Sequence, residues 1–231
     1  MSGFTEVVRD FAGLFFPRFC LGCYGPLVSG EDVLCTHCLL DLPRTSDLQH
    51  HQNGVWLRFV GRIPVERAAA FLKFQKRGIV QHLMHEMKYN HHPEVGFRLG
   101  KAFGREMELA GMNQFDLIIP VPLHPGRERQ RGFNQSVMIA RGIGEVIGKP
   151  VEEHISVRSK RTATQTTKTR MKRWENVRTV FAVLTPERLK GKSVLLVDDV
   201  ITTGATLEAC AGHLLEAGCS SLSIACLAEA R

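Results

Sequence analysis

One stretch near the C-terminal end constrains the fold more than any other part of the chain. Val194 to Val197 is continuously aliphatic and is followed by Asp198 and Asp199 and then by threonine, glycine and alanine. An uninterrupted aliphatic strand suits a parallel sheet covered on both faces, because neither side of such a strand meets water. From Leu207 apolar residues recur at helical spacing, and they stop before Gly218. The stretch predicts a strand, a turn at the two acids, and a helix.

The loop between this strand and this helix has the chemistry of a phosphate site. The first N–H groups of a helix lack intrahelical partners, and the helix dipole places partial positive charge beside them. Small residues let the backbone approach an anion closely, and hydroxyl groups add hydrogen-bond donors. The residues concerned are Ile201, Thr202, Thr203, Gly204, Ala205 and Thr206.

Asp198 and Asp199 need a second explanation, because carboxylates beside an anion site repel the anion. They are compatible with it if they accept hydrogen bonds from sugar hydroxyls or face a divalent cation. A ligand with a phosphate and a ribose, carried with Mg²⁺, accounts for both features. An ordinary strand-to-helix turn leaves the paired acids unexplained.

A second strand-loop-helix unit is expected in the middle of the chain. Phe115 to Pro122 is predicted to be a buried strand ended by prolines, and Asn134 is a good N-cap for the helix that follows. The loop between them contains Leu123, His124 and Arg127, with further arginines at 129 and 131. These arginines either bring positive charge to a ligand or belong to a solvated loop.

The remaining pattern completes an α/β domain with a parallel sheet flanked by helices. Further strands are expected at Ala68–Phe74, near Val180–Leu184 and at Leu222–Leu227, and further helices over Ile79–Tyr89 and Val95–Ala110. With 231 residues the chain has room for one such domain and a small appendage. We expect the domain to span residues 51–231, after a polar linker at Thr45–Gly54.

The appendage, residues 1–50, is expected to hold an amphipathic helix and a metal module. Four cysteines, Cys20, Cys23, Cys35 and Cys38, form two Cys-x-x-Cys pairs, the pattern of a structural Zn²⁺ site. His37 is a possible substitute ligand, and redox-active pairs are the weaker alternative because neither pair follows a predicted strand. Three further cysteines lie singly on apolar elements and are expected to be core residues.

Hydropathy indicates whether the chain enters a membrane, and the distribution of charge indicates where it could bind anions. No apolar run approaches the ~20 residues that span a bilayer, and the apolar N-terminal patch does not have the form of a signal peptide, so we expect a cytoplasmic protein without membrane insertion. The net charge of +7 is local, because the stretch from Arg158 to Arg173 is basic and contains no acid while the rest of the chain balances.

This basic stretch predicts a flexible loop over about residues 158–176. Its candidate contacts are Arg158, Lys160, Arg161, Lys168, Arg170 and Arg173. As a lid it would bring cations to a leaving group and exclude water. As an arm it would bind the phosphates of a nucleic acid such as single-stranded DNA.

The strand with two acids and a Thr/Gly loop resembles the 5-phosphoribosyl-1-pyrophosphate (PRPP) signature of type I phosphoribosyltransferases. The order of the motifs is more specific: the four-Cys module, Lys88-Tyr89, Ile119-Pro-Val-Pro-Leu-His124, Arg131-Gly-Phe-Asn-Gln135 and then the PRPP signature. This order resembles the ComF family of bacterial proteins, which is associated with competence and the use of DNA taken up by the cell.

The resemblance implies a type I phosphoribosyltransferase-like fold and a function. Asp198 and Asp199 would bind the ribose hydroxyls, residues 201–206 the 5′-phosphate, and Leu123, His124 and Arg127 the pyrophosphate. The chain would transfer phosphoribose from PRPP, bound with Mg²⁺, to an unidentified nucleobase-like acceptor and release pyrophosphate. The alternative is a non-catalytic competence accessory that binds PRPP or single-stranded DNA and works with other competence proteins.

Overall fold

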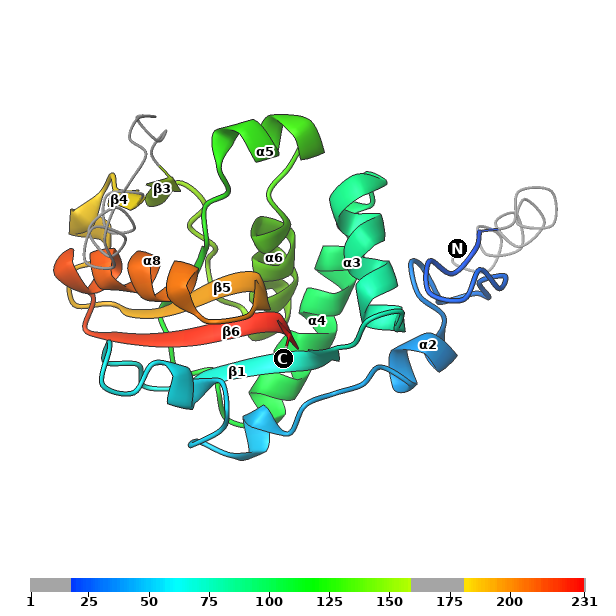
Figure 1. The fold of residues 1–231 in the computed structure, drawn as a ribbon, viewed down its shortest axis with the longest axis horizontal. Helices are drawn as coiled ribbons and strands as arrows, with labels where there is room; N and C mark the ends of the chain where they lie inside the picture. Colours follow the sequence, from blue (N-terminus) through cyan, green and yellow to red (C-terminus); the bar gives the residue numbers. More distant parts are fainter. Residues whose placement is uncertain (1–17, 159–180, 231) are drawn as a thin grey trace, which may run out of the picture.

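A four-stranded parallel sheet forms the centre of the molecule (Figure 1). The computed structural model describes residues 18–158 and 181–230. The sheet has the order β1-β6-β5-β2, and each of its three pairings is parallel. Its strands are β1 (Ala68–Phe74), β2 (Leu117–Pro120), β5 (Ser193–Ile201) and β6 (Ser221–Ala230). A separate antiparallel pair consists of β3 (Ser156–Arg158) and β4 (Phe181–Val183).

Helices connect these strands, as the sequence predicts for an α/β domain. The helices are α2 (Thr36–Leu40), α3 (Ile79–Tyr89), α4 (Pro93–Leu109), α5 (Pro125–Arg131), α6 (Gln135–Ile147) and α8 (Ala205–Glu216). Short 3-10 turns are η1 (Asp47–Gln49), η2 (Trp56–Arg58) and η3 (Pro186–Arg188). The predicted strand at β1 and the predicted helix at α3 are confirmed with the expected bounds.

The sheet is buried on both faces because successive side chains of a strand point to opposite sides. On one face Leu195 and Val197 pack in a core with α3, α4 and α6. On the other face Val194 and Leu196 pack with α8 and with Phe59, which follows η2. The aliphatic run therefore supplies both cores, as a parallel strand covered on both sides requires.

Helices α4 and α6 approach one another very closely, and glycines make this possible. A Cβ atom on Gly142 would lie 2.2 Å from the carbonyl oxygen of Phe97, and a Cβ atom on Gly100 would lie 2.3 Å from that of Ile139. Real Cβ atoms do not come so near to backbone oxygens, so only glycine fits at these two positions. The contact fixes α6, whose first turn contributes to the site described below.

Strand β5 is longer than predicted. It stays paired with β6 as far as Ile201, which is opposite Glu229, so Asp198 and Asp199 lie inside the strand and the prediction of a turn at these acids was wrong. The β-branched residues after the acids favour a strand, and β6 extends far enough to supply hydrogen-bond partners. The chain turns only after Ile201, and Gly204 adopts a left-handed conformation with φ 83°.

The segment predicted as a linker, Thr45–Gly54, runs beside β1. The N–H group of Thr45 donates to the carbonyl of Phe71 at 2.9 Å, and the Ala70 N–H group donates to Asp47 Oδ2 at 3.0 Å. Polar side chains made this segment resemble a linker, but here they satisfy backbone groups of an edge strand, which would otherwise be exposed to pairing with another chain.

Two predictions lie outside the described residues. These are the N-terminal helix, expected to end before Pro17, and the basic loop beyond Arg158. Within residues 18–158 and 181–230, no helix has both the length and the apolar character needed to cross a bilayer.

Candidate functional site

The paired acids lie at the carboxyl end of β5, and side chains from two helices, α3 and α6, contact them. Ser136, in the first turn of α6, donates its hydroxyl to Asp198 Oδ1 at 2.9 Å, and the N–H group of Asp199 donates to the same oxygen at 2.9 Å. Lys88, near the end of α3, places its Nζ 2.7 Å from Asp199 Oδ2. The strand, α3 and α6 thus converge on the two carboxylates.

Electrostatics distinguish the two acids. Burial and the neighbouring Asp199 charge raise the pKa of Asp198 to about 7, although the Asp199 N–H group, the Ser136 hydroxyl and Lys88 act in the opposite direction. The Lys88 ammonium instead lies directly against Asp199. The pair therefore combines one acid whose pKa is raised toward neutrality with a second acid that contacts a cation.

The loop after β5 forms a shallow pocket at the N-terminus of α8. Its lining consists of Asp198 and residues 200–207. The side chains of Thr202, Thr203 and Thr206 are exposed there, and Gly204 occupies the N-cap position of α8. The predicted order of strand, loop and helix is confirmed, and it presents hydroxyl groups and a helix N-terminus to one pocket.

The second unit, from β2 to α6, reaches the same edge of the sheet. Because β2 and β5 are adjacent and parallel, their carboxyl ends lie together. Asn134 caps α6 as predicted, accepting from the Ser136 N–H group at 3.0 Å, and its amide donates to the Val121 carbonyl at 3.0 Å. This cap orients the turn from which Ser136 contacts Asp198.

The predicted loop between these elements contains a short helix, α5. His124 is its N-cap, with Nδ1 accepting from the Gly126 N–H group at 3.1 Å, and Leu123 lies just before it. Arg127 lies within α5 and its side chain is exposed. Arg131, at the end of α5, donates to Gln135 Oε1 at 2.7 Å and lies over the Tyr89 ring at 5.6 Å.

Two residues of this site were missed by sequence reasoning. Lys88 belongs to a motif that resembled the family pattern but had no role assigned, and Ser136 directly follows the expected Arg-Gly-Phe-Asn-Gln motif. Their contacts join residues far apart in the chain, and no spacing rule links them to the acids. Position two after an N-cap is the one signal that could have directed attention to Ser136.

Of the predicted basic-loop residues, only Arg158 is described. It ends β3, and its guanidinium lies 5.4 Å from the centre of the Phe181 ring on β4. Lys160, Arg161, Lys168, Arg170 and Arg173 lie outside the described residues.

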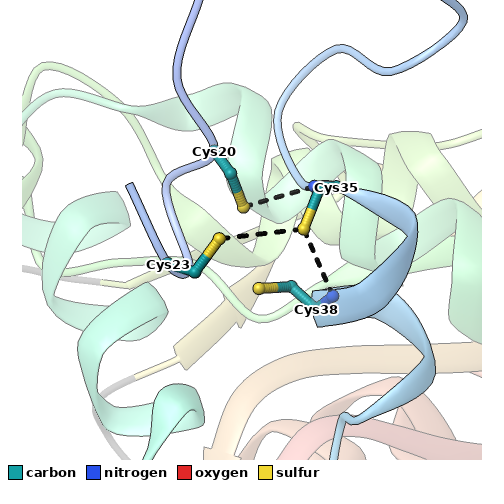
Figure 2. Close-up of side chains that lie close together, drawn as sticks. All are labelled: Cys20, Cys23, Cys35 and Cys38. Atoms are coloured by element: carbon teal, nitrogen blue, oxygen red, sulfur yellow. Dashed lines mark hydrogen bonds between the residues drawn. The ribbon is translucent and has the colours of Figure 1, made fainter. Parts of the chain in front are cut away.

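The four N-terminal cysteines point toward one another (Figure 2). All four sulfur atoms lie within 4.8 Å of one another, and Cys23 Sγ is 3.8 Å from Cys35 Sγ. A tetrahedral Zn²⁺ with Zn–S bonds of about 2.3 Å separates its sulfur ligands by about 3.8 Å, so the arrangement fits such an ion. Cys35 and Cys38 come from the start of α2, and the other two from the preceding segment.

The surroundings favour a thiolate at one of these sulfurs, that of Cys20. N–H groups of Gly22 and Cys35 donate to Cys20 Sγ at 3.3 and 3.2 Å. Burial raises the pKa of Cys20, but the N–H donors outweigh it and lower this pKa to about 7, whereas burial and the neighbouring thiols raise the pKa of Cys38. His37, considered as a substitute ligand, is instead 91% exposed and pairs with Asp41. The four-Cys cluster could therefore hold a metal ion such as zinc.

The three other cysteines, Cys210, Cys219 and Cys226, are buried in the core, as predicted. Burial raises the pKa of each of these thiols. They are small apolar residues of the face that α8 covers.

Comparison with known proteins agrees with the sequence motifs. The phosphoribosyl transferase domain family matches residues 134–231, a range that includes α6, β5, the pocket loop, α8 and β6. Among solved structures, a glutamine PRPP amidotransferase from B. subtilis covers 62% of this chain and 30% of its own, with a TM-score of 0.45 and 23% identity. A purine phosphoribosyltransferase from Pyrococcus horikoshii covers 57% of this chain and 71% of its own, with a TM-score of 0.38 and 22% identity.

Curated relatives point to a narrower group. The DNA utilization protein YhgH of Salmonella typhimurium is 30% identical over 149 residues, which cover 63% of this chain and 65% of the relative. Competence protein F of Haemophilus influenzae is 33% identical over 116 residues, which cover 50% of this chain and 51% of the relative. The chain thus spans slightly less than two thirds of the length of YhgH. The chain is therefore similar in sequence to YhgH and to Competence protein F, its residues 134–231 match the phosphoribosyl transferase domain, and its N-terminal part contains a four-Cys cluster.

Proposed function

We propose that the chain binds PRPP with Mg²⁺ and transfers its phosphoribosyl group to a nitrogen acceptor, releasing pyrophosphate. One observation carries the proposal: the paired acids and the pocket loop lie side by side at the carboxyl end of β5, in a chain with a phosphoribosyl transferase domain. A site for phosphate alone has no use for two adjacent carboxyl groups.

The proposed roles follow the order of groups along the ligand. Asp198 and Asp199 accept hydrogen bonds from the ribose hydroxyls. A carboxyl oxygen can accept such a bond when the group is ionised or when that oxygen is not already engaged. Residues 201–206 bind the 5′-phosphate through the helix N-terminus and the threonine hydroxyls. Leu123, His124 and Arg127 lie after β2, the strand adjacent to β5, where the pyrophosphate would extend.

In the proposed reaction the bond between C1′ and the pyrophosphate oxygen breaks, and the electron pair leaves with pyrophosphate. The lone pair of the acceptor nitrogen forms the new bond to C1′, and the nitrogen then loses its proton to solvent. When bound with PRPP, Mg²⁺ would neutralise part of the charge on the leaving pyrophosphate. The protein fixes the ribose and phosphate, so that positioning and charge compensation supply most of the rate enhancement.

Lys88 prepares the site for this ligand. Its ammonium compensates Asp199, which keeps two adjacent carboxyl groups compatible in one partly buried place. Asp199 Oδ1 accepts from the Val200 N–H group at 2.6 Å, and Asp198 Oδ1 accepts from Ser136, so Asp198 Oδ2 is the oxygen best placed to accept from a ribose hydroxyl.

We propose that the four-Cys cluster binds one structural Zn²⁺. The cysteine segment packs in the same core as α3, since Cys20, Leu34 and Cys38 belong to the cluster that contains Val80 and Leu83. A closed four-thiolate site has no open coordination position for a substrate, so its role is to fold this segment against the domain that begins near residue 51.

A second function is favoured by the names of the relatives. DNA utilization protein YhgH and Competence protein F suggest a role connected with DNA. In that case the chain is an accessory that binds PRPP or single-stranded DNA without turnover, with the basic stretch from residue 158 as its nucleic-acid contact.

Calorimetric titration of PRPP with Mg²⁺ tests the first proposal. We expect saturable binding to the wild type and none to Asp198→Ala/Asp199→Ala. Binding that is indifferent to the double substitution would refute the assigned site. Pyrophosphate release, measured across a panel of nucleobases, then separates an enzyme from a binding protein.

For single-stranded DNA, binding that survives deletion of residues 158–173 would refute the contact assigned to that stretch.

A further inference from the structure

The segment around η2, which is far from the pocket loop in the sequence, contacts this loop. Arg58, the last residue of η2, donates from Nη1 to the carbonyl oxygen of Thr202 and from Nη2 to Glu229 Oε2, the latter at 3.1 Å. Glu229 is only 4% exposed and lies opposite Ile201 near the end of β6. One guanidinium therefore joins η2 to Thr202, the residue that follows β5, and to Glu229 near the end of β6.

Phe59 adds a second contact from the same segment. Its ring is 1% exposed, and two of its atoms lie 3.2 and 3.3 Å from the place that a Cβ atom on Gly204 would occupy. Gly204 has φ 83°, a conformation that other residues rarely adopt. The ring thus packs against the backbone of the loop where the loop turns into α8.

Arg62 makes a third contact of a different kind. Its Nη1 lies 3.3 Å from Oε2 of Glu208 in the first turn of α8, and its side chain is 52% exposed. An ion pair this exposed contributes little to stability, because water screens the attraction between its charges. Arg62 is therefore a natural control, since it carries the same charge on the same segment without touching the loop backbone.

We propose that Arg58 is a positioning residue for the ligand phosphate, an inference that rests on the proposed function. The Thr202 carbonyl and the Thr203 N–H group belong to one planar peptide unit and point in opposite directions. Because Arg58 fixes the carbonyl, the N–H group points away from the guanidinium and remains available to an anion. Because Glu229 compensates the charge of Arg58, the effect on the phosphate is geometric rather than electrostatic.

Ribose 5-phosphate is the probe for this role, since it carries the phosphate without the pyrophosphate. Losing a charge-assisted hydrogen bond predicts about 10- to 100-fold weaker binding for Arg58→Ala. Arg58→Lys keeps the charge but cannot reproduce two divergent bonds, so we expect a similar loss. Arg62→Ala should stay within about fivefold of the wild type. Full rescue by Arg58→Lys, or an equal loss in Arg62→Ala, would overturn the proposal.

A second readout needs no ligand. Hydrogen exchange of the amides of residues 203–207 should be faster in Arg58→Ala than in Arg62→Ala, while exchange in α4 and α6 stays the same. Equal exchange rates in the loop would refute the positioning role. If the wild type fails to bind ribose 5-phosphate and PRPP, the proposed function is wrong, and the exchange measurement still decides whether Arg58 orders the loop.

Discussion

Asp198→Asn offers a quantitative test of the electrostatics at the site. In the folded chain, burial and the Asp199 charge raise the pKa of Asp198 to about 7, compared with an ordinary value of 3.8. Between these two pH values the folded state binds more protons than the unfolded state, so the free energy of unfolding falls as the pH rises. The asparagine variant lacks this titration.

The size of the effect follows from the two pKa values. At 1.36 kcal/mol for each pH unit, the full difference corresponds to about 4 kcal/mol. Water reaches part of the Asp198 side chain, and this reduces the expected effect to about 2–4 kcal/mol. Asp198→Asn should therefore match the wild type near pH 4 and exceed its stability above pH 7.

Urea denaturation at a series of pH values from 4 to 8 measures this difference. Ser136→Ala is the matched second variant. It removes a donor that favours the ionised form of Asp198, so its stability should continue to fall to a higher pH than that of the wild type. A difference between Asp198→Asn and the wild type that does not change with pH would refute the reasoning.

Three further predictions concern the scaffold, the acids and the cysteines. Gly142→Ala should destabilise the fold by on the order of 3 kcal/mol in thermal and chemical unfolding, because its Cβ would collide with the Phe97 carbonyl. The control is Gly212→Ala on α8, where a Cβ atom meets no neighbour within 4 Å; this variant should be neutral or more stable by about 1 kcal/mol. Lys88→Gln should cost about 1.5–3 kcal/mol at pH 8 and less at pH 5, where Asp198 is protonated; an equal cost at both pH values would contradict this. A thiol reagent should modify the four N-terminal cysteines of the folded protein quickly only after zinc is removed by a chelator, and rapid modification before chelation would argue against a bound metal.

The sequence predicted those elements whose hydrophobic period is uninterrupted. The aliphatic run before Asp198 and the helical pattern of Ile79–Tyr89 were sufficient to place β5 and α3. The four cysteines were also predictable, because the Cys-x-x-Cys spacing itself brings sulfur atoms together. In these cases the local pattern and the tertiary structure favour the same conformation.

Features that depend on distant partners were not predictable. Strand β5 continues past the two acids because β6 pairs with Asp198, Val200 and Ile201. The polar segment around Asp47 is ordered because it hydrogen-bonds to β1, an edge strand. The contacts of Lys88 and Arg58 with the end of β5 join residues more than one hundred positions apart. Periodicity and spacing hold no information about such pairs.

Hydrogen exchange of the wild type, with and without PRPP and Mg²⁺, tests the central claim most directly. If the ligand occupies the pocket at the end of β5, the amides of residues 198–208 should gain protection, because they include the N–H groups that face the phosphate. The cysteine module should show no comparable change. Binding without added protection in this stretch, or protection confined to another part of the chain, would contradict the assigned site.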